Sequence, residues 1–216
     1  DLVLGTNVSS NEYLMLQGGQ FSKSRKHAVW LPSFLERYDA DCLRYYLSIN
    51  MPETHDTDFR WEEFVDRVNN ELIGTYGNFV HRVMTLTNRL ATGEGNPVQK
   101  YDDIEKYSEI ISQCEDLVRS AIDSMERQRF KEALRSIMSI AQIGNQLLQR
   151  CAPWKYLKSE ESLEKNDSLS GLALSWRLCR SLGICTRPFM PFQSERLWEM
   201  LGEKTDLDGQ LWDSST

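Results

Sequence analysis

Apolar residues recur every three or four positions along most of this 216-residue chain, which is the spacing of amphipathic helices. The longest such stripe lies between residues 59 and 90, where it predicts one long helix. The same spacing predicts further helices over residues 39–50, 102–125, 128–150, 168–185 and 191–202. The chain is therefore expected to be all-α, with four to five long helices packed as a bundle.

The start of the chain does not follow this pattern. Residues 12–16 (EYLML) predict a short strand, and the glycine pair that follows predicts a turn. Asp56, Thr57 and Asp58 precede the long helix, and their side chains are predicted to cap its first turn. Residues 157–167 predict a charged connector between two helices. A short loop-and-strand segment is thus expected to precede the bundle.

Composition narrows the possible functions. The net charge is −7, so the chain is a poor general binder of nucleic acid, and any such contact has to be local. Its five cysteines form no CxxC pair, which is typical of buried thiols in a reducing compartment, and no metal site is expected. No apolar stretch is long enough to span a membrane, and the protein is expected in the cytoplasm. Because the chain begins at Asp1 rather than at Met, it is interpreted as a fragment of a longer protein.

The first stretch with candidate chemistry is GGQFSKSRK, at residues 18–26. Here Ser22, Lys23 and Ser24 follow a glycine-led turn, and a cation between hydroxyl groups suits a phosphate. The stretch is not a Walker loop, because the GxxxxGK[ST] pattern is absent. On spacing alone, a solvated basic loop is the simpler interpretation.

A second candidate lies within the predicted long helix. Gly74 and Gly77 leave a gap there, beside Asn78 and Arg82, which are four positions apart and so share a helix face. Such a gap could admit a flat polar ring, and both Asn and Arg can read base edges. Taken alone, the segment is explained more simply by glycines that allow close helix packing and by two polar surface residues.

The third candidate is QRCAPWKYL, at residues 149–157. Pro153 ends a predicted helix and fixes the backbone before Trp154. A Trp held at a rigid helix end is a natural stacking platform for an unpaired base. An isolated Trp in this position is more often a core residue that covers the end of a bundle.

Together these stretches resemble one family. QFSKS, at residues 20–24, resembles the KMSKS signature of class I aminoacyl-tRNA synthetases. The stretches RYYLSINMPETHDTDFRWEEFVDRVNNEL, GNFVHR, NQLLQRCAPW and MPFQSERLW are similar to the C-terminal part of methionyl-tRNA synthetases. The resemblance covers roughly residues 10–212. It implies that residues 1–35 end a catalytic domain and that residues 36–216 form an α-helical anticodon-binding domain.

The resemblance also implies a catalytic role for the first stretch. Ser22, Lys23 and Ser24 would bind ATP, with Lys23 as the main cation that stabilises the adenylation transition state. Gln20 stands where the signature has its first Lys, so one cationic contact is missing or is supplied by residue 25 or 26. ATP with Mg²⁺ would serve the full methionine-tRNA ligase. The fragment alone is expected to be inactive and to hold no cofactor, because the nucleotide-binding fold and the methionine pocket are absent.

Asn78, Arg82 and Trp154 match the family's anticodon-reading residues. They would recognise the CAU anticodon of tRNA(Met), chiefly its first base, a cytosine. Two alternatives remain. The chain could be the tail of another class I synthetase, of the cysteine or leucine type, or it could be a non-catalytic helical protein-interaction module. The module alternative predicts a Trp154 that is buried in the core and remote from Asn78 and Arg82.

Overall fold

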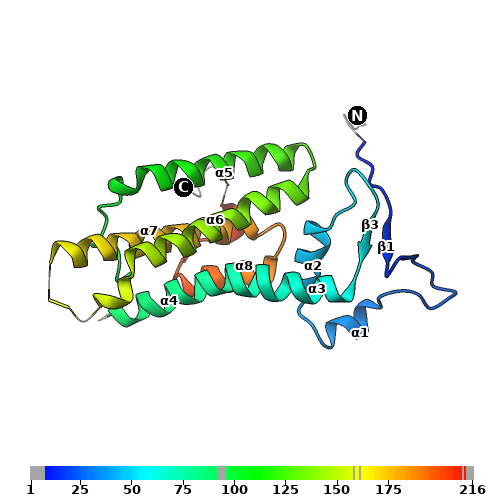
Figure 1. Cartoon of the computed structure of the whole chain (residues 1–216), viewed down its shortest axis with the longest axis horizontal. Coiled ribbons are helices and arrows are strands. Elements are labelled where there is room, and N and C mark those ends of the chain that lie inside the picture. The colour runs from blue at the N-terminus through cyan, green and yellow to red at the C-terminus, as the bar shows by residue number, and fades with distance from the viewer. Residues whose placement is uncertain (1–7, 92–95, 158, 161, 211, 213–216) are drawn as a thin grey trace.

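Long helices lie side by side and form the body of the computed structural model (Figure 1). The structure describes residues 8–91, 96–157, 159–160, 162–210 and 212. The long elements are a continuous helix over 61–90, α5 (Ser108–Glu126), α6 (Phe130–Cys151) and α7 (Leu163–Thr186). Shorter α-helices in the described part of the chain are α1 (Leu31–Leu35), α2 (Ala40–Ile49) and α8 (Pro191–Met200). The predicted all-α bundle of four to five long helices is confirmed.

The α7 helix is the central element of the bundle, and it is buried on nearly every side. It begins five residues earlier than the sequence predicts, because Ser162 caps it: the Ser162 hydroxyl accepts a hydrogen bond from the Lys165 amide at 3.2 Å. The predicted charged connector over 157–167 is therefore wrong at its second half. Charged residues misled the prediction, since they form the first turn of a helix whose remaining turns are apolar.

The long helix has an unusual middle. It runs through α3 (Trp61–Arg67), a π-helical segment η1 (Val68–Gly77) and α4 (Asn78–Leu90) without a break. A π-helix pairs residues five apart, and such segments are often found at functional sites. Most of the predicted apolar stripe is buried as expected. The π segment widens the helix immediately before Asn78, and the sequence did not predict it.

A small three-stranded sheet lies at one end of the molecule, at the right of Figure 1. Its strands are β1 (Leu14–Leu16), β2 (Gly19–Gln20) and β3 (Thr57–Phe59), in the order β2-β1-β3. The β1 and β2 strands are antiparallel and confirm the predicted strand and turn, whereas β1 and β3 are parallel.

The predicted helix caps at Asp56, Thr57 and Asp58 are wrong, because these residues enter or precede β3 and the helix begins only at Trp61. The two carboxylates cap a distant loop instead. The Asp56 carboxylate accepts from the Tyr13 amide at 2.9 Å, and the Asp58 carboxylate accepts from the Gly18 amide at 3.0 Å. Their side chains therefore tie the start of the chain to β3.

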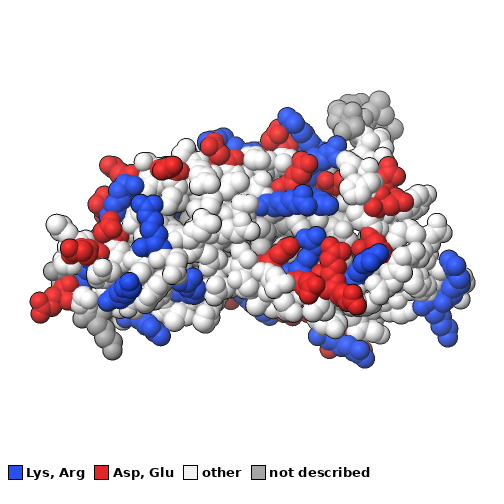
Figure 2. All heavy atoms as spheres, viewed as in Figure 1, with Lys and Arg blue, Asp and Glu red and all other residues white. Residues whose placement is uncertain are grey.

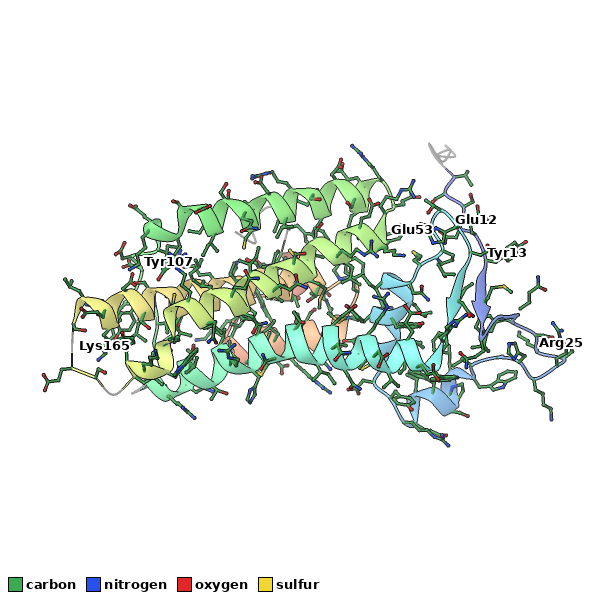
Figure 3. All side chains as sticks on the ribbon, in the orientation of Figure 1. Glu12, Tyr13, Arg25, Glu53, Tyr107 and Lys165 are labelled. Atoms are coloured by element: carbon green, nitrogen blue, oxygen red, sulfur yellow. The ribbon has the colours of Figure 1, made fainter. Side chains whose placement is uncertain are left out.

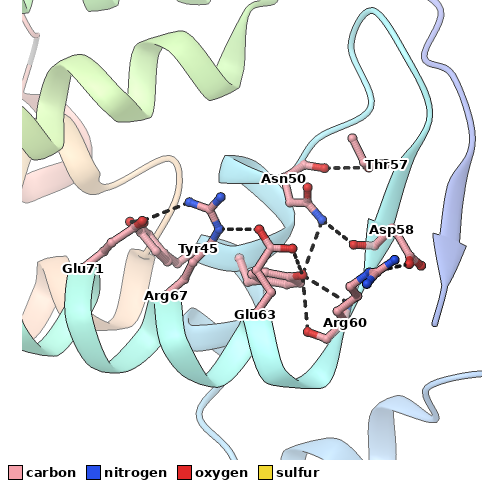
Figure 4. Close-up of polar contacts among 9 residues, drawn as sticks. Tyr45, Asn50, Thr57, Asp58, Arg60, Glu63, Arg67 and Glu71 are labelled. Carbon is pink, nitrogen blue, oxygen red and sulfur yellow. Dashed lines mark hydrogen bonds and ion pairs between the residues drawn. The ribbon is translucent and has the colours of Figure 1, made fainter. Parts of the chain in front are cut away.

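Polar contacts join the strands, α2 and the first half of the long helix (Figure 4). Arg67 bridges Glu63 and Glu71 at 2.8 and 2.9 Å, and the Tyr45 hydroxyl donates to Glu71 at 2.6 Å. Asn50, at the end of α2, donates to the Asp58 carbonyl at 2.9 Å. Ion pairs between side chains that are exposed to this extent contribute little to stability. Together, the polar contacts anchor the long helix at the end that carries the sheet.

The residues that the structure describes form two apolar cores. The large one fills the bundle, and the small one lies under the sheet and α1. The small core consists of Leu16, Phe34, Leu43, Tyr46, Phe59 and Phe64. It draws residues from both sides of position 35, and the predicted boundary between two domains at that position stays a prediction.

Candidate functional site

Asn78 and Arg82 lie on the face of α4 that meets α6. Asn78 is exposed and Arg82 is half-buried, one helical turn further on. Both side chains point at Asn145 of α6: the Asn78 amide nitrogen and the Arg82 Nη1 each lie 3.5 Å from the Asn145 Oδ1. These hydrogen bonds are at the long end of the accepted range. The structure thus brings the two predicted residues together through a third polar side chain.

Trp154 lies beside this group. The α6 helix ends at Cys151, Ala152 adopts a left-handed conformation with φ of 44°, and Pro153 starts a single 3-10 turn that carries Trp154. The Trp154 side chain is 39% exposed rather than part of the core. The Arg82 guanidinium carbon lies 5.3 Å from the centre of its ring, within cation–π range. The buried, remote Trp154 that a protein-interaction module predicts is not what the structure shows.

Two glycines on neighbouring helices hold the site in register. A Cβ atom at Gly144, on α6, would overlap the ring of Phe79, which is fully buried on α4. A Cβ atom at Gly171, on α7, would overlap the sulfur of Cys151. Gly144 precedes Asn145, and Phe79 follows Asn78. The close contact of ring and backbone therefore fixes the positions of the two amides opposite each other.

Hydrogen bonds hold the end of α6, directly before the turn that carries Trp154. The Tyr107 hydroxyl donates to the Asp167 carbonyl at 3.0 Å and lies 3.3 Å from the Cys151 sulfur, while the Ser168 hydroxyl donates to the Cys151 carbonyl at 2.6 Å. Burial raises the pKa of the Cys151 thiol, so the sulfur stays protonated and uncharged at neutral pH. Tyr107 is labelled near this end of the bundle in Figure 3. These contacts fix the end of α6, from which the turn with Trp154 continues.

The loop with Ser22, Lys23 and Ser24 lies at the opposite end of the molecule. Its base is closed by paired backbone bonds between Ser22 and His27, and the Ser22 and Ser24 hydroxyls are 3.2 Å apart. Lys23 and Ser24 are exposed, and Arg25 projects from the tip of the loop in Figure 3. The structure does not bring this loop near Asn78, Arg82 or Trp154.

Comparisons with known proteins match both the sheet-bearing end and the helical bundle to tRNA ligases. The family model described as the anticodon-binding domain of tRNA ligase matches residues 108–216, about half of the chain. This chain belongs to that family of tRNA ligases. A second family model, tRNA synthetases class I (M), matches residues 1–84.

Curated relatives that match along most of the chain agree with this assignment. The chain is 37% identical over 195 residues to the methionine–tRNA ligase of Pyrococcus abyssi. The aligned residues make up 90% of this chain and 26% of the relative. It is 39% identical over 201 residues to the methionine–tRNA ligase of Bacteroides fragilis, and the aligned residues make up 92% of this chain and 29% of that relative. The chain thus spans less than a third of the length of the curated relatives it matches.

The fold has a solved counterpart. Mycobacterium tuberculosis methionyl-tRNA synthetase in complex with methionyl-adenylate superposes with a TM-score of 0.73 at 20% identity, over 88% of this chain and 37% of that one. At this identity the likeness concerns the fold. It confirms that the bundle and the small sheet-bearing end occur together in one known architecture.

Asn145 is the residue of this domain that the sequence analysis missed. It lies in NQLLQRCAPW, one of the stretches that carry the resemblance, directly after a glycine and between the apolar and polar faces of α6. An Asn next to a Gly inside a predicted helix is a signal that the sequence offers, because both residue types are poor helix formers. The partners of Asn145, however, belong to another helix, and sequence periodicity does not pair helices.

Two further observations limit the chemistry. Within the ranges that the structure describes, no group of three or more His, Cys, Asp or Glu side chains is arranged to hold a metal ion. The same part of the chain contains no helix that is both long and apolar enough to cross a membrane.

Proposed function

We propose that this chain is the C-terminal part of a methionine–tRNA ligase and that it binds the anticodon stem-loop of tRNA(Met). The observation that carries the proposal is the convergence of Trp154 with Asn78 and Arg82 through Asn145. Unpaired bases in RNA loops are recognised by stacking on aromatic rings and by hydrogen bonds to their edges. Trp154 offers the ring, and the amide and guanidinium groups offer the hydrogen bonds. The CAU anticodon, chiefly its first base, is the proposed ligand.

The charge of the molecule is compatible with such a local contact. Acidic and basic side chains are interspersed over the face seen in Figure 2, with no single basic field. Non-specific affinity for RNA should therefore be weak, because that affinity comes mainly from phosphate contacts. Recognition then depends on the few bases that reach the site, which suits a domain that must select one anticodon.

The exposed loop at the other end serves the full ligase in this proposal. Ser22, Lys23 and Ser24 would contact the phosphates of ATP, which enters with Mg²⁺, and Lys23 would stabilise charge that develops during methionyl-adenylate formation. Gln20 removes one cation from the family signature, and Arg25, exposed at the loop tip, can supply a replacement. Residues 1–35 would be the end of the catalytic domain. The full enzyme, working in the cytoplasm, would then transfer methionine to tRNA.

A titration tests the proposed anticodon recognition. A stem-loop with a CAU anticodon should bind this chain about tenfold tighter than the same stem-loop with UAU, because a good edge contact is worth about 1–3 kcal/mol of discrimination. Fluorescence anisotropy of labelled RNA at one fixed salt concentration measures both affinities. Stem-loops from cysteine and leucine tRNAs are the matched competitors. Equal binding of all four RNAs would contradict the assignment.

A further inference from the structure

Asn145 can determine which groups at the site donate hydrogen bonds and which accept them. Its amide nitrogen donates to two backbone carbonyls, that of Thr75 in η1 at 2.9 Å and that of Ala141 in α6 at 3.1 Å. Both acceptors are carbonyls, so the nitrogen has to face them and the oxygen has to face the other way. The amide of Asn145 therefore has one allowed orientation.

The Asn145 oxygen faces Asn78 and Arg82. Because it can only accept, the Asn78 side chain has to turn its amide nitrogen toward Asn145, at 3.5 Å, and Arg82 has to direct Nη1 there. The Asn78 oxygen is then turned away from α6. Among the described residues, no hydrogen bond to that oxygen is recorded, and the Asn78 side chain is exposed. An acceptor from Asn78 and the remaining N–H donors of Arg82 are thus presented beside Trp154.

We propose that Asn145 is a positioning residue that makes the site selective for cytosine over uracil. The inference rests on the proposed function. The Watson–Crick edge of cytosine carries an amine donor next to two acceptors, which complements an Asn78 oxygen and an Arg82 guanidinium. Uracil presents a carbonyl where cytosine has the amine, so two acceptors would face each other. Asn145 acts through Asn78 and Arg82 and does not itself touch the base.

The surrounding packing keeps this arrangement rigid. Gly144 and the buried Phe79 ring fix α6 against α4 at the height of Asn145. The Thr75 carbonyl belongs to the π-helical segment, so the widened helix supplies one of the two acceptors that orient the Asn145 amide. The π segment therefore has a role in the site, because it places the Thr75 carbonyl where the Asn145 amide can donate to it.

Asn145→Leu tests the inference. Leucine cannot orient Asn78, so the Asn78 amide can flip and offer its nitrogen to uracil. The ratio of the CAU and UAU affinities should fall about tenfold, mainly because the UAU stem-loop binds better. A merely structural role would weaken binding of both stem-loops alike and leave the ratio unchanged. Gln146→Leu, which changes an exposed amide on the next position of α6, is the matched control and should keep the wild-type ratio.

Asn145→Asp is the second variant. A carboxylate loses the donation to the Thr75 and Ala141 carbonyls, so thermal stability should fall, but either of its oxygens still accepts from Asn78. The ratio should therefore stay within about threefold of the wild type. Loss of the ratio in Asn145→Asp as large as in Asn145→Leu would overturn the inference, as would an unchanged ratio in Asn145→Leu. The wild-type chain separates this failure from a failure of the proposed function, because a wild-type ratio near one would remove the anticodon assignment itself.

Discussion

Replacing Trp154 with alanine should weaken binding of a CAU stem-loop by about 1–3 kcal/mol, which is the range measured for stacking of a base on an aromatic side chain. The ring is partly exposed and fixed by the turn after α6, so it can stack without prior rearrangement of the backbone. Its removal also deprives Arg82 of its cation–π partner. Anisotropy titrations of wild type and variant at equal salt measure the loss.

Trp30→Ala is the control for this prediction. Trp30 is 50% exposed and lies just before α1, at the sheet-bearing end of the molecule. Its loss should leave the affinity for the stem-loop unchanged. If Trp30→Ala and Trp154→Ala weaken binding equally, the RNA does not use the proposed site.

A methyl group at position 144 should have the second large effect. Gly144→Ala is expected to destabilise the chain by about 1–3 kcal/mol, the typical cost of overpacking a well-packed core. The added carbon overlaps the ring of Phe79, which is fully buried between the helices. This cost should exceed the gain of up to about 1 kcal/mol that alanine brings to a helix interior. Urea unfolding followed by circular dichroism measures the difference.

Gly183→Ala is the matched control on α7. A Cβ atom there would lie 3.5 Å from the nearest atom, on Trp198, which is ordinary van der Waals contact. Alanine should therefore be neutral or stabilising by up to about 1 kcal/mol, through helix propensity alone. Equal effects of the two substitutions would show that the contact between Gly144 and Phe79 does not hold α6 against α4.

Most of the bundle could be predicted because its information is local. The spacing of apolar residues shows both that a segment is helical and which of its faces is buried, as in the stripe from Phe64 to Val83. The third strand could not be predicted in this way. It has three residues, one of them acidic, and it exists because it pairs with β1, which is distant in sequence. Sequence reasoning therefore took residues 56–58 for helix caps.

The π-helical segment escaped prediction for a related reason. Its apolar residues still recur every three or four positions, so the pattern does not distinguish it from an α-helix. Gly74 and Gly77, a residue type that is costly in a helix interior, both lie in η1. Glycines can indicate a departure from α-helical pairing, but the pairing of residues five apart becomes visible only in the structure.

The candidate site was predictable in its residue types but not in its assembly. Spacing places Asn78 and Arg82 on one helix face, and Pro153 indicates a fixed Trp154. That the two features meet depends on how α4 packs against α6, and this packing is set by Gly144 and the shape of the Phe79 ring. Tertiary contacts of this kind involve residues far apart in sequence, so no local pattern contains them.

A double-mutant cycle between Trp154 and the first anticodon base tests the proposed contact most directly. Wild type and Trp154→Ala are each titrated with a CAU stem-loop and with one that is abasic at the first position. If ring and base stack, the two changes share one interaction, and the coupling energy should be about 1–3 kcal/mol. Strictly additive effects would contradict the account, because they would mean that Trp154 and the first base do not touch.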